Sequence, residues 1–275
     1  MCVCVCVCVC VCVCVYIYIY IYIYIYIYIY IYIYIYIYIE LKTPWRKFDW
    51  GQKEVLKKHL EEFSVSLPDV QNIKILIAGQ VRAGKSSFIN SLKSHRVRGA
   101  DDDLPCVLTD IMGLEPDVLE GSQPEDSNAI YGHVKDDHKS EDFISDPLLS
   151  DQAFCLVYVV DANTIQYASD RLDKLRIIRK RISDKRIPQV IIMTKVDEAC
   201  PLVNDDLKKV YTSKSVKQKM HLCSEMIGVP MNCIFPVKNC HNEIEVDNDV
   251  DVLILKAFDQ IENFANDRLR EAASN

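Results

Sequence analysis

The sequence has little that would build a metal site or a disulfide framework. The first 39 residues hold seven of the 13 cysteines, and the other six have irregular spacing. The Cys and His residues that could suggest a zinc site are His221, Cys223, Cys233, Cys240 and His241. They form no CxxC or HxxxH spacing, so we interpret them as structural and predict no zinc site. A secretory signal pattern is also lacking, which predicts reduced intracellular thiols.

Positive charge is in short supply as well. The chain carries 32 Lys and Arg against 39 Asp and Glu, a net charge of −7. Residues 1–39 contain no charged side chain, so the whole balance falls on the 236 residues that follow. An acidic protein is a poor candidate for unspecific nucleic-acid binding, and we predict no such partner. A segment of this length can bury one substantial core.

Residues 1–39 lack the pattern of any globular segment. Cys alternates with Val, and then Tyr with Ile, without a break. One strand of this length would span about 130 Å, and one helix about 58 Å, nearly twice the bilayer core. The codons TGT, GTG, TAT and ATA encode these four residues, so we hypothesise a translated microsatellite. Peptides from the tract in a digest of the native protein would contradict this.

A membrane anchor is the alternative for the same tract, because it is uncharged and long enough to span. Strict alternation with 12 tyrosines argues against it. We therefore expect no membrane partner unless the tract belongs to the native protein. In either case the tract is an aggregation hazard, being uncharged, prone to β-structure and free of proline.

The most informative motif follows an apolar run from Ile73 to Ala78, which is typical of a strand buried in a parallel sheet. Gly79, four residues, Gly84, Lys85 and Ser86 have the Walker A spacing, between this strand and a predicted helix. Backbone N–H groups of such a loop bind phosphates, the lysine reaches the β- and γ-phosphates, and the serine hydroxyl ligates Mg²⁺. A simple strand-to-helix turn with an exposed lysine is the alternative.

A second motif follows the predicted strand 105–109. Asp110 opens a DxxG pattern that ends at Gly113. In register behind a Walker A loop, this carboxylate would hold Mg²⁺ through water, and the glycine N–H would meet the γ-phosphate.

A third motif, Thr194 to Asp197, follows the predicted strand 188–193 and is a TKxD variant of the guanine-reading NKxD. Asp197 would accept hydrogen bonds from the guanine N1–H and 2-amino group, while the Lys195 stem covers the ring. Each bond to a charged group is worth about 1.5–3 kcal/mol, which favours guanine over adenine. A capping aspartate at a strand-to-helix junction is the alternative.

Hydrophobic periodicity supplies the remaining elements. It predicts helices over residues 54–63, 86–94, 164–183, 208–227 and 250–269, strands over 154–160 and 232–237, and a long surface loop over 120–150. Lys238 and Asn239 then stand where a guanine-binding fold makes a backbone contact to the base oxygen. This order predicts an α/β P-loop fold, mostly parallel, with helices on both faces of the sheet.

Three segments make up the predicted organisation: the tract 1–39, a lead-in with a helix over 40–72, and a nucleotide-binding domain over 73–275. The lead-in carries Trp45, Phe48 and Trp50, which we expect to anchor it on the domain rather than to bind a ligand.

Several runs together resemble the interferon-induced protein 44 and 44-like family. They are GQVRAGKSSFINS, LPCVLTDIMGLEP, FCLVYVVDANTIQYASDRLDKLRIIRKR and VDVLILKAF, and the lead-in TPWRKFDWG is similar to fish members. The resemblance covers residues 43–270. It implies a Ras-like P-loop fold, binding of GTP or GDP with Mg²⁺, interferon induction, and a cytoplasmic antiviral or immune role with an unidentified protein partner. Many members also carry an N-terminal TLDc domain, which is absent here.

The resemblance also implies the site residues, position by position. Gly84, Lys85, Ser86 and Ser87 would hold phosphate and Mg²⁺. Asp110 and Gly113 would form the metal and γ-phosphate edge. Thr194 to Asp197 would meet the base.

The sequence departs from that family's fold at two points. About ten residues separate the helix end near Ser94 from Pro105, too few for an effector loop with a Mg²⁺-ligating Thr, a strand and a hairpin. A skipped exon or a gene-model fault would explain this gap. Leu114 stands where Ras-type enzymes place the Gln that orients water, so we expect slow or partner-dependent hydrolysis.

Three functions stay open at this point. The first is a GTP-binding switch or scaffold with weak or no hydrolysis, and the second is a working GTPase that uses Arg82 of the loop as a charge donor. The third is an ATP-dependent P-loop enzyme, or an isoform too truncated to function.

Overall fold

We describe the protein from a computed structural model. It describes residues 2–67, 70, 72–96, 106–110, 151–165, 175–176, 179–180, 186–239 and 247–274. The predicted loop 120–150, most of the predicted helix 164–183, Gly113 and Leu114 lie outside these residues.

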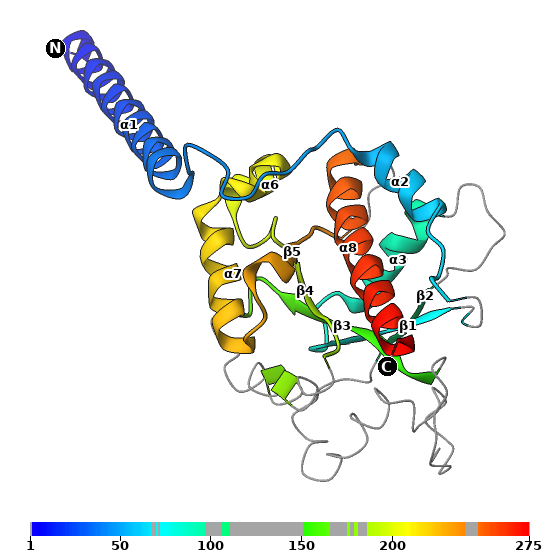
Figure 1. The fold of residues 1–275 in the computed structure, drawn as a ribbon. Coiled ribbons are helices and arrows are strands. Elements are labelled where there is room, and N and C mark those ends of the chain that lie inside the picture. Colours follow the sequence, from blue (N-terminus) through cyan, green and yellow to red (C-terminus); the bar gives the residue numbers. More distant parts are fainter. Residues whose placement is uncertain are drawn as a thin grey trace.

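Five parallel strands form the centre of the molecule (Figure 1). They are β1 (Ile73–Gly79), β2 (Cys106–Asp110), β3 (Ala153–Asp161), β4 (Gln189–Thr194) and β5 (Ile234–Pro236). Their order across the sheet is β2-β1-β3-β4-β5, and every pairing is parallel. All residues of β1 and β3 are buried, as expected for strands covered on both faces. The predicted α/β fold with a parallel sheet is confirmed.

Helices cover both faces of this sheet. They are α2 (Lys53–Glu61), α3 (Lys85–Arg96), α6 (Pro201–Asp205), α7 (Lys214–Ile227) and α8 (Asn248–Ala273), with 3₁₀ turns η3 (Leu207–Tyr211) and η4 (Met231–Cys233). The connection through α3 runs from β1 to β2, and that through α7 runs from β4 to β5, in opposite directions along the sheet. Right-handed crossovers therefore put α3 and α7 on opposite faces. α8 packs beside α3 and over β3 (Figure 1).

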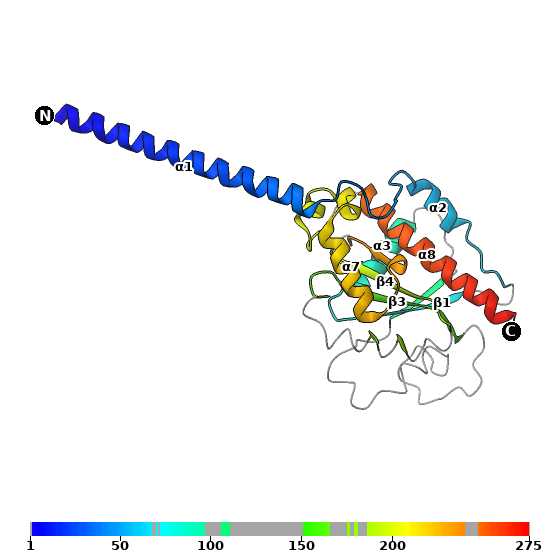
Figure 2. The same ribbon diagram turned by 60° about the vertical axis from the view of Figure 1, so that its left-hand side comes forward.

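A single helix, α1 (Cys2–Ile39), leads into the domain and points away from it (Figure 2). The side chains from Cys14 to Ile31 are all exposed. This stretch is apolar and long enough to cross a membrane, judged by length and composition alone. A repeat of period two on a helix of 3.6 residues per turn distributes tyrosine and isoleucine over every face, so no face suits a core. The microsatellite origin of the tract stays a hypothesis.

The lead-in docks on the domain through its aromatic residues. The ring centroids of Trp45 and Phe48 lie 5.3 Å and 4.9 Å from that of Tyr211. The Arg46 guanidinium donates to the carbonyls of Ile234, at 2.8 Å, and Met231, at 2.5 Å. Burial raises the pKa of Tyr211 to about 12, although Arg46 acts against it. These aromatics have partners inside the fold, in line with the anchoring role expected of them.

Element boundaries differ from the predicted ones where capping decides them. The predicted helix 208–227 is interrupted, because Ser213 accepts a hydrogen bond from Val216 N and begins α7 there. α8 continues to Ala273, past the predicted end at residue 269. The last strand is shorter than predicted, since Met231 to Cys233 form η4 before it. α6 was not predicted at all.

Candidate functional site

The sheet has one point where the direction of winding reverses. From β1 the chain continues to β2 on one side, and the next strand, β3, pairs with β1 on the other. The carboxyl ends of β1 and β3 meet in register, with Gly79 opposite Val159. In open α/β sheets, ligands bind outside the carboxyl ends of the strands at such a reversal. The predicted Walker A loop begins at this position.

Two glycines make the loop geometry possible. A Cβ on Gly79 would lie 2.3 Å from the Val159 carbonyl oxygen, so only glycine lets β1 approach β3 there. Gly84 has a φ of +93°, and a Cβ on it would lie 2.6 Å from Asn239 Nδ2. The loop then enters α3, whose first four N–H groups have no partner within the helix and attract anions.

Two side chains from neighbouring strand ends brace the back of the loop. Thr194 Oγ1, at the end of β4, donates to the Ala83 carbonyl at 2.6 Å. Asn239 Nδ2, after β5, donates to the next carbonyl, that of Gly84, at 3.1 Å. Both side chains are buried. Because these buried side chains hold the two carbonyls, the N–H groups of the same peptide units point the opposite way and can face a ligand.

Two cations lie on the loop. Lys85 Nζ donates to the carbonyls of Gly79, at 3.0 Å, and Gln80, at 3.3 Å, so the ammonium is folded back over the loop. Arg82 is exposed and has a φ of +66°, an uncommon conformation for a residue other than glycine. Together with the start of α3, they make the loop electropositive.

The end of β4 supplies the remaining predicted residues. Lys195 has a φ of +57°, and its Nζ lies 2.7 Å from Asp161 Oδ2 at the end of β3. Asp197 is half-buried, and its carboxylate has no hydrogen bond or ion pair among the described residues. A carboxylate in this state is available to donors on a ligand.

Two buried polar atoms lie at the loop without a partner in the described part of the chain. Gln80 Nε2 and Asn239 Oδ1 are buried and have no hydrogen-bond partner among the described residues. Buried polar groups are normally paired, so both atoms are candidates for ligand or water contacts.

The two predicted Mg²⁺ ligands lie at the start of a helix and at the end of a strand. The Ser86 side chain is exposed at the start of α3, and Asp110 pairs with Ile77 at the end of β2. A hydroxyl and a carboxylate are the oxygen donors that Mg²⁺ prefers. No cluster of three or more His, Cys, Asp or Glu able to hold a metal occurs in the described part of the chain.

Two of the described cysteines are too deeply buried for thiol chemistry. Burial raises the pKa of Cys223 to about 12 and that of Cys155 further still. Such thiols stay protonated and are unreactive at neutral pH.

The structure brings most of the predicted residues to one edge of the sheet. Gly113 lies outside the described residues, and the side chain of Asp110 is not described although its backbone ends β2 at this edge. Thr194 was predicted within the base-reading segment and Asn239 to contact the base through its backbone; both stay predictions, and their side chains contact the loop carbonyls. Sequence analysis did not identify Asp161, and its position directly after a buried strand was the available signal.

Several known proteins with related names align with about three quarters of this chain. Human interferon-induced protein 44-like is 28% identical over 242 residues, which is 74% of this chain and 53% of that protein. Mouse interferon-induced protein 44 is 28% identical over 245 residues, which is 75% of this chain and 58% of that protein. Human interferon-induced protein 44 is 28% identical over 242 residues, which is 74% of this chain and 54% of that protein. The chain is a distant homologue of the interferon-induced protein 44 and 44-like family.

The chain spans about half the length of the interferon-induced protein 44 relatives that it matches. No protein-family model matches it. Among solved structures, a probable GTP-binding protein engB aligns with 72% of this chain and 99% of its own, at 16% identity and a TM-score of 0.40.

Proposed function

We propose that the chain binds GTP and GDP with Mg²⁺ and acts as a switch or scaffold with weak or no hydrolysis. One observation carries the proposal: Thr194 and Asn239 hold two successive carbonyls of a glycine loop at the winding reversal of the sheet. These bonds connect the glycine loop to the ends of β4 and β5, where the base of a bound nucleotide would lie. The carboxylate of Asp197, which has no partner among the described residues, is suited to the two N–H donors of guanine.

Binding is tested by calorimetry on the full chain, kept soluble in a non-ionic detergent, with GTP, GDP and ATP in the presence of Mg²⁺. Lys85→Ala should weaken the binding of all three nucleotides by about tenfold or more, because it removes a charged contact to phosphate. Lys93→Ala is the matched control, since this exposed lysine lies on the same helix but outside the loop. A folded chain that ignores GDP and GTP would overturn the proposal.

Base preference is tested separately with Asp197→Ala. The variant should lose about tenfold or more of its affinity for GDP and little for ADP, since only guanine donates to the carboxylate. Equal losses for both nucleotides would contradict a base-reading role.

Mg²⁺ would be held by the Ser86 hydroxyl and, through water, by Asp110. Its chemistry is to neutralise charge on the β- and γ-phosphates. Chelation of Mg²⁺ with EDTA should therefore weaken the binding of GTP more than the binding of GDP. An unchanged ratio of the two affinities would contradict this assignment.

A working GTPase is the second candidate, and the exposed Arg82 in its left-handed conformation is the observation that favours it. Strained residues of this kind cluster at functional sites. Single-turnover hydrolysis separates the candidates. A rate near that of GTP in water favours the scaffold, whereas a faster rate that Arg82→Ala abolishes favours the enzyme. A preference for ATP over GTP would instead support the ATP-dependent alternative.

An interferon-induced role in the cytoplasmic immune response, with a protein partner, is also proposed. Its support is the homology to interferon-induced protein 44 relatives, over half of their length. The transcript should rise when cells of the source organism are treated with interferon. An unchanged transcript level would contradict the immune assignment.

A further inference from the structure

A carboxylate outside every sequence motif lies beside the predicted base-reading segment. Asp161 is the last residue of β3 and is 7% exposed. Its Oδ2 accepts from Lys195 Nζ at 2.7 Å. Its Oδ1 accepts from Asn163 N at 2.8 Å and from Asn163 Nδ2 at 3.1 Å. Both oxygens are therefore fixed, and the carboxylate has one orientation.

The lysine that it holds has an unusual backbone. Lys195 directly follows β4 and has a φ of +57°. A bulky residue in this region is strained and stays there only when its surroundings determine it. The ion pair with Asp161 is such a determinant, because it fixes the far end of the side chain across the ends of two strands.

The ion pair is not required for joining the two strands. β3 and β4 already pair along six residues, and Ala162 N donates to the Thr194 carbonyl at 3.0 Å beyond the last pair. The Lys195 side chain also keeps 23% of its surface exposed, at the edge where a nucleotide would bind. The pairing thus controls the direction of an accessible side chain.

We propose that Asp161 is a positioning residue for base recognition, which holds Lys195 so that its aliphatic stem covers the face of a purine. This rests on the nucleotide binding proposed above. With the ammonium engaged by Asp161, the far end of the side chain is fixed, and its methylenes would pack on the base. Without Asp161 the ammonium is free, and the stem samples several rotamers.

The test compares a ligand with a base and a ligand without one. Asp161→Asn keeps the size of the side chain and removes the charge. In the full chain with detergent, we expect about tenfold weaker binding of GDP, and unchanged binding of inorganic tripolyphosphate. A merely structural role would weaken both ligands alike, and that outcome would overturn the proposal. Unchanged GDP binding would overturn it too.

A double-mutant cycle sharpens the assignment. Lys195→Met keeps an unbranched stem and lacks the ammonium, so in this background Asp161→Asn should change GDP affinity no further. A full additional loss would show that Asp161 acts through another group. Asp206→Asn is the matched control, since this exposed carboxylate only accepts from Lys208 N, and it should leave GDP binding unchanged.

A second variant covers the case in which Asp161→Asn does not fold. Asn163→Ala removes one of the two donors to Asp161 Oδ1, and it leaves the ion pair of Oδ2 with Lys195 in place. We expect a smaller loss for GDP and none for tripolyphosphate, and equal binding of GDP by variant and wild type would overturn the proposal. If the wild type binds neither ligand, the nucleotide-binding function fails. If it binds both, and the variants match it, only the positioning role fails.

Discussion

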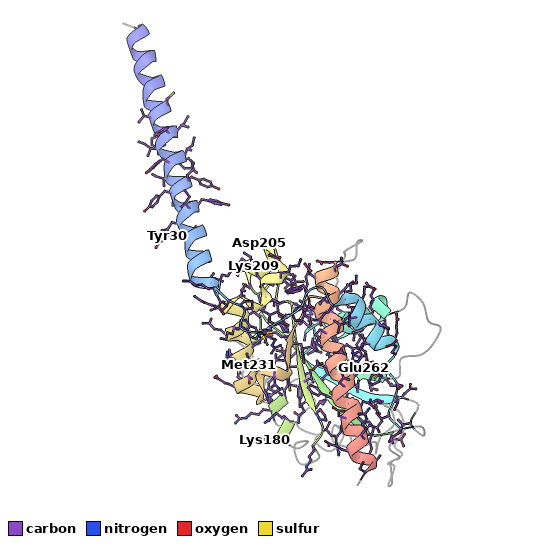
Figure 3. All side chains as sticks on the ribbon, turned by 45° about the horizontal axis from the view of Figure 1, so that its top comes forward. Tyr30, Lys180, Asp205, Lys209, Met231 and Glu262 are labelled. Carbon is purple, nitrogen blue, oxygen red and sulfur yellow. The ribbon has the colours of Figure 1, made fainter. Side chains whose placement is uncertain are left out.

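The two longest described helices, α8 and α1, differ in their capping and in the distribution of their apolar side chains. α8 begins at a capping aspartate, Asp247, whose side chain accepts from Asp249 N. It buries a continuous stripe, made of Val250, Ile254, Phe258, Ile261, Ala265 and Leu269. α1 has no acidic residue in its first turn, no basic residue in its last, and tyrosines such as Tyr30 that point into open space (Figure 3).

The difference shows that hydrophobicity alone does not make a helix part of a fold. α1 is the more apolar of the two, yet its period-two repeat offers no face that differs from the others. α8 is less apolar on average but concentrates its apolar residues on one face. Tertiary packing of such a face, rather than propensity, supplies most helical stability in proteins.

The largest expected effect comes from the buried stripe of α8. Phe258 is 1% exposed, and Phe258→Ala should lower the free energy of unfolding by about 3–5 kcal/mol. On α1, Ile25 is 50% exposed, and Ile25→Ala should change it by less than about 0.5 kcal/mol. Urea unfolding of both variants measures the contrast. Similar losses at the two positions would contradict it.

The next effect concerns the ion pair that docks α2 on α8. Lys53 Nζ lies 2.5 Å from Asp251 Oδ2, and the Asp251 side chain is only 1% exposed. Lys53→Ala should cost about 1–3 kcal/mol, because it takes a cation from a buried carboxylate. Lys58, on the same helix, pairs with Glu62 while both side chains are more than 60% exposed. Lys58→Ala is therefore the control and should cost less than about 0.5 kcal/mol.

A smaller effect depends on pH. Burial acts to raise the pKa of Asp259, but hydrogen bonds from Lys256, Gln260 and His59 outweigh it, and the pKa is lowered. The stabilisation is thus present above the unfolded-state pKa, about 3.9, and is lost as pH falls through the lower folded value. Asp259→Asn should be less stable than wild type at pH 6, with the gap shrinking below pH about 4. Urea unfolding at both pH values measures this, and a constant gap would contradict it.

Apolar runs made most of the fold predictable from the sequence. The five described strands were all predicted, because each is a short apolar run that ends before a polar residue or a glycine. The connections that decide side-chain roles were not predictable in this way. Lys195 and Asp161 are 34 residues apart, and Asn239 and Gly84 are 155 apart. Their contacts exist only because the strand order places these ends together.

Local capping accounts for the remaining errors. A continuous pattern predicted one helix over 208–227, but the hydroxyl of Ser213 offers an N-cap in its middle. Asp206 likewise accepts from Lys208 N and starts η3. Such side chains compete with the helix for backbone donors, and periodicity does not register them.

The smallest expected change in stability follows from removing α1 except its last residue. A chain that begins at Ile39 keeps this residue, which packs against the core, and the contacts of Glu40 with Lys209 and Thr212, and it loses no other described residue that packs on the core. Its free energy of unfolding should match that of the full chain to within about 0.5 kcal/mol. Its solubility should rise, because the exposed apolar surface is gone. Urea unfolding and sedimentation, both in detergent-free buffer for the short chain, measure these outcomes. A loss of stability as large as that of Phe258→Ala would mean that α1 packs on the domain, and would erase the contrast with α8.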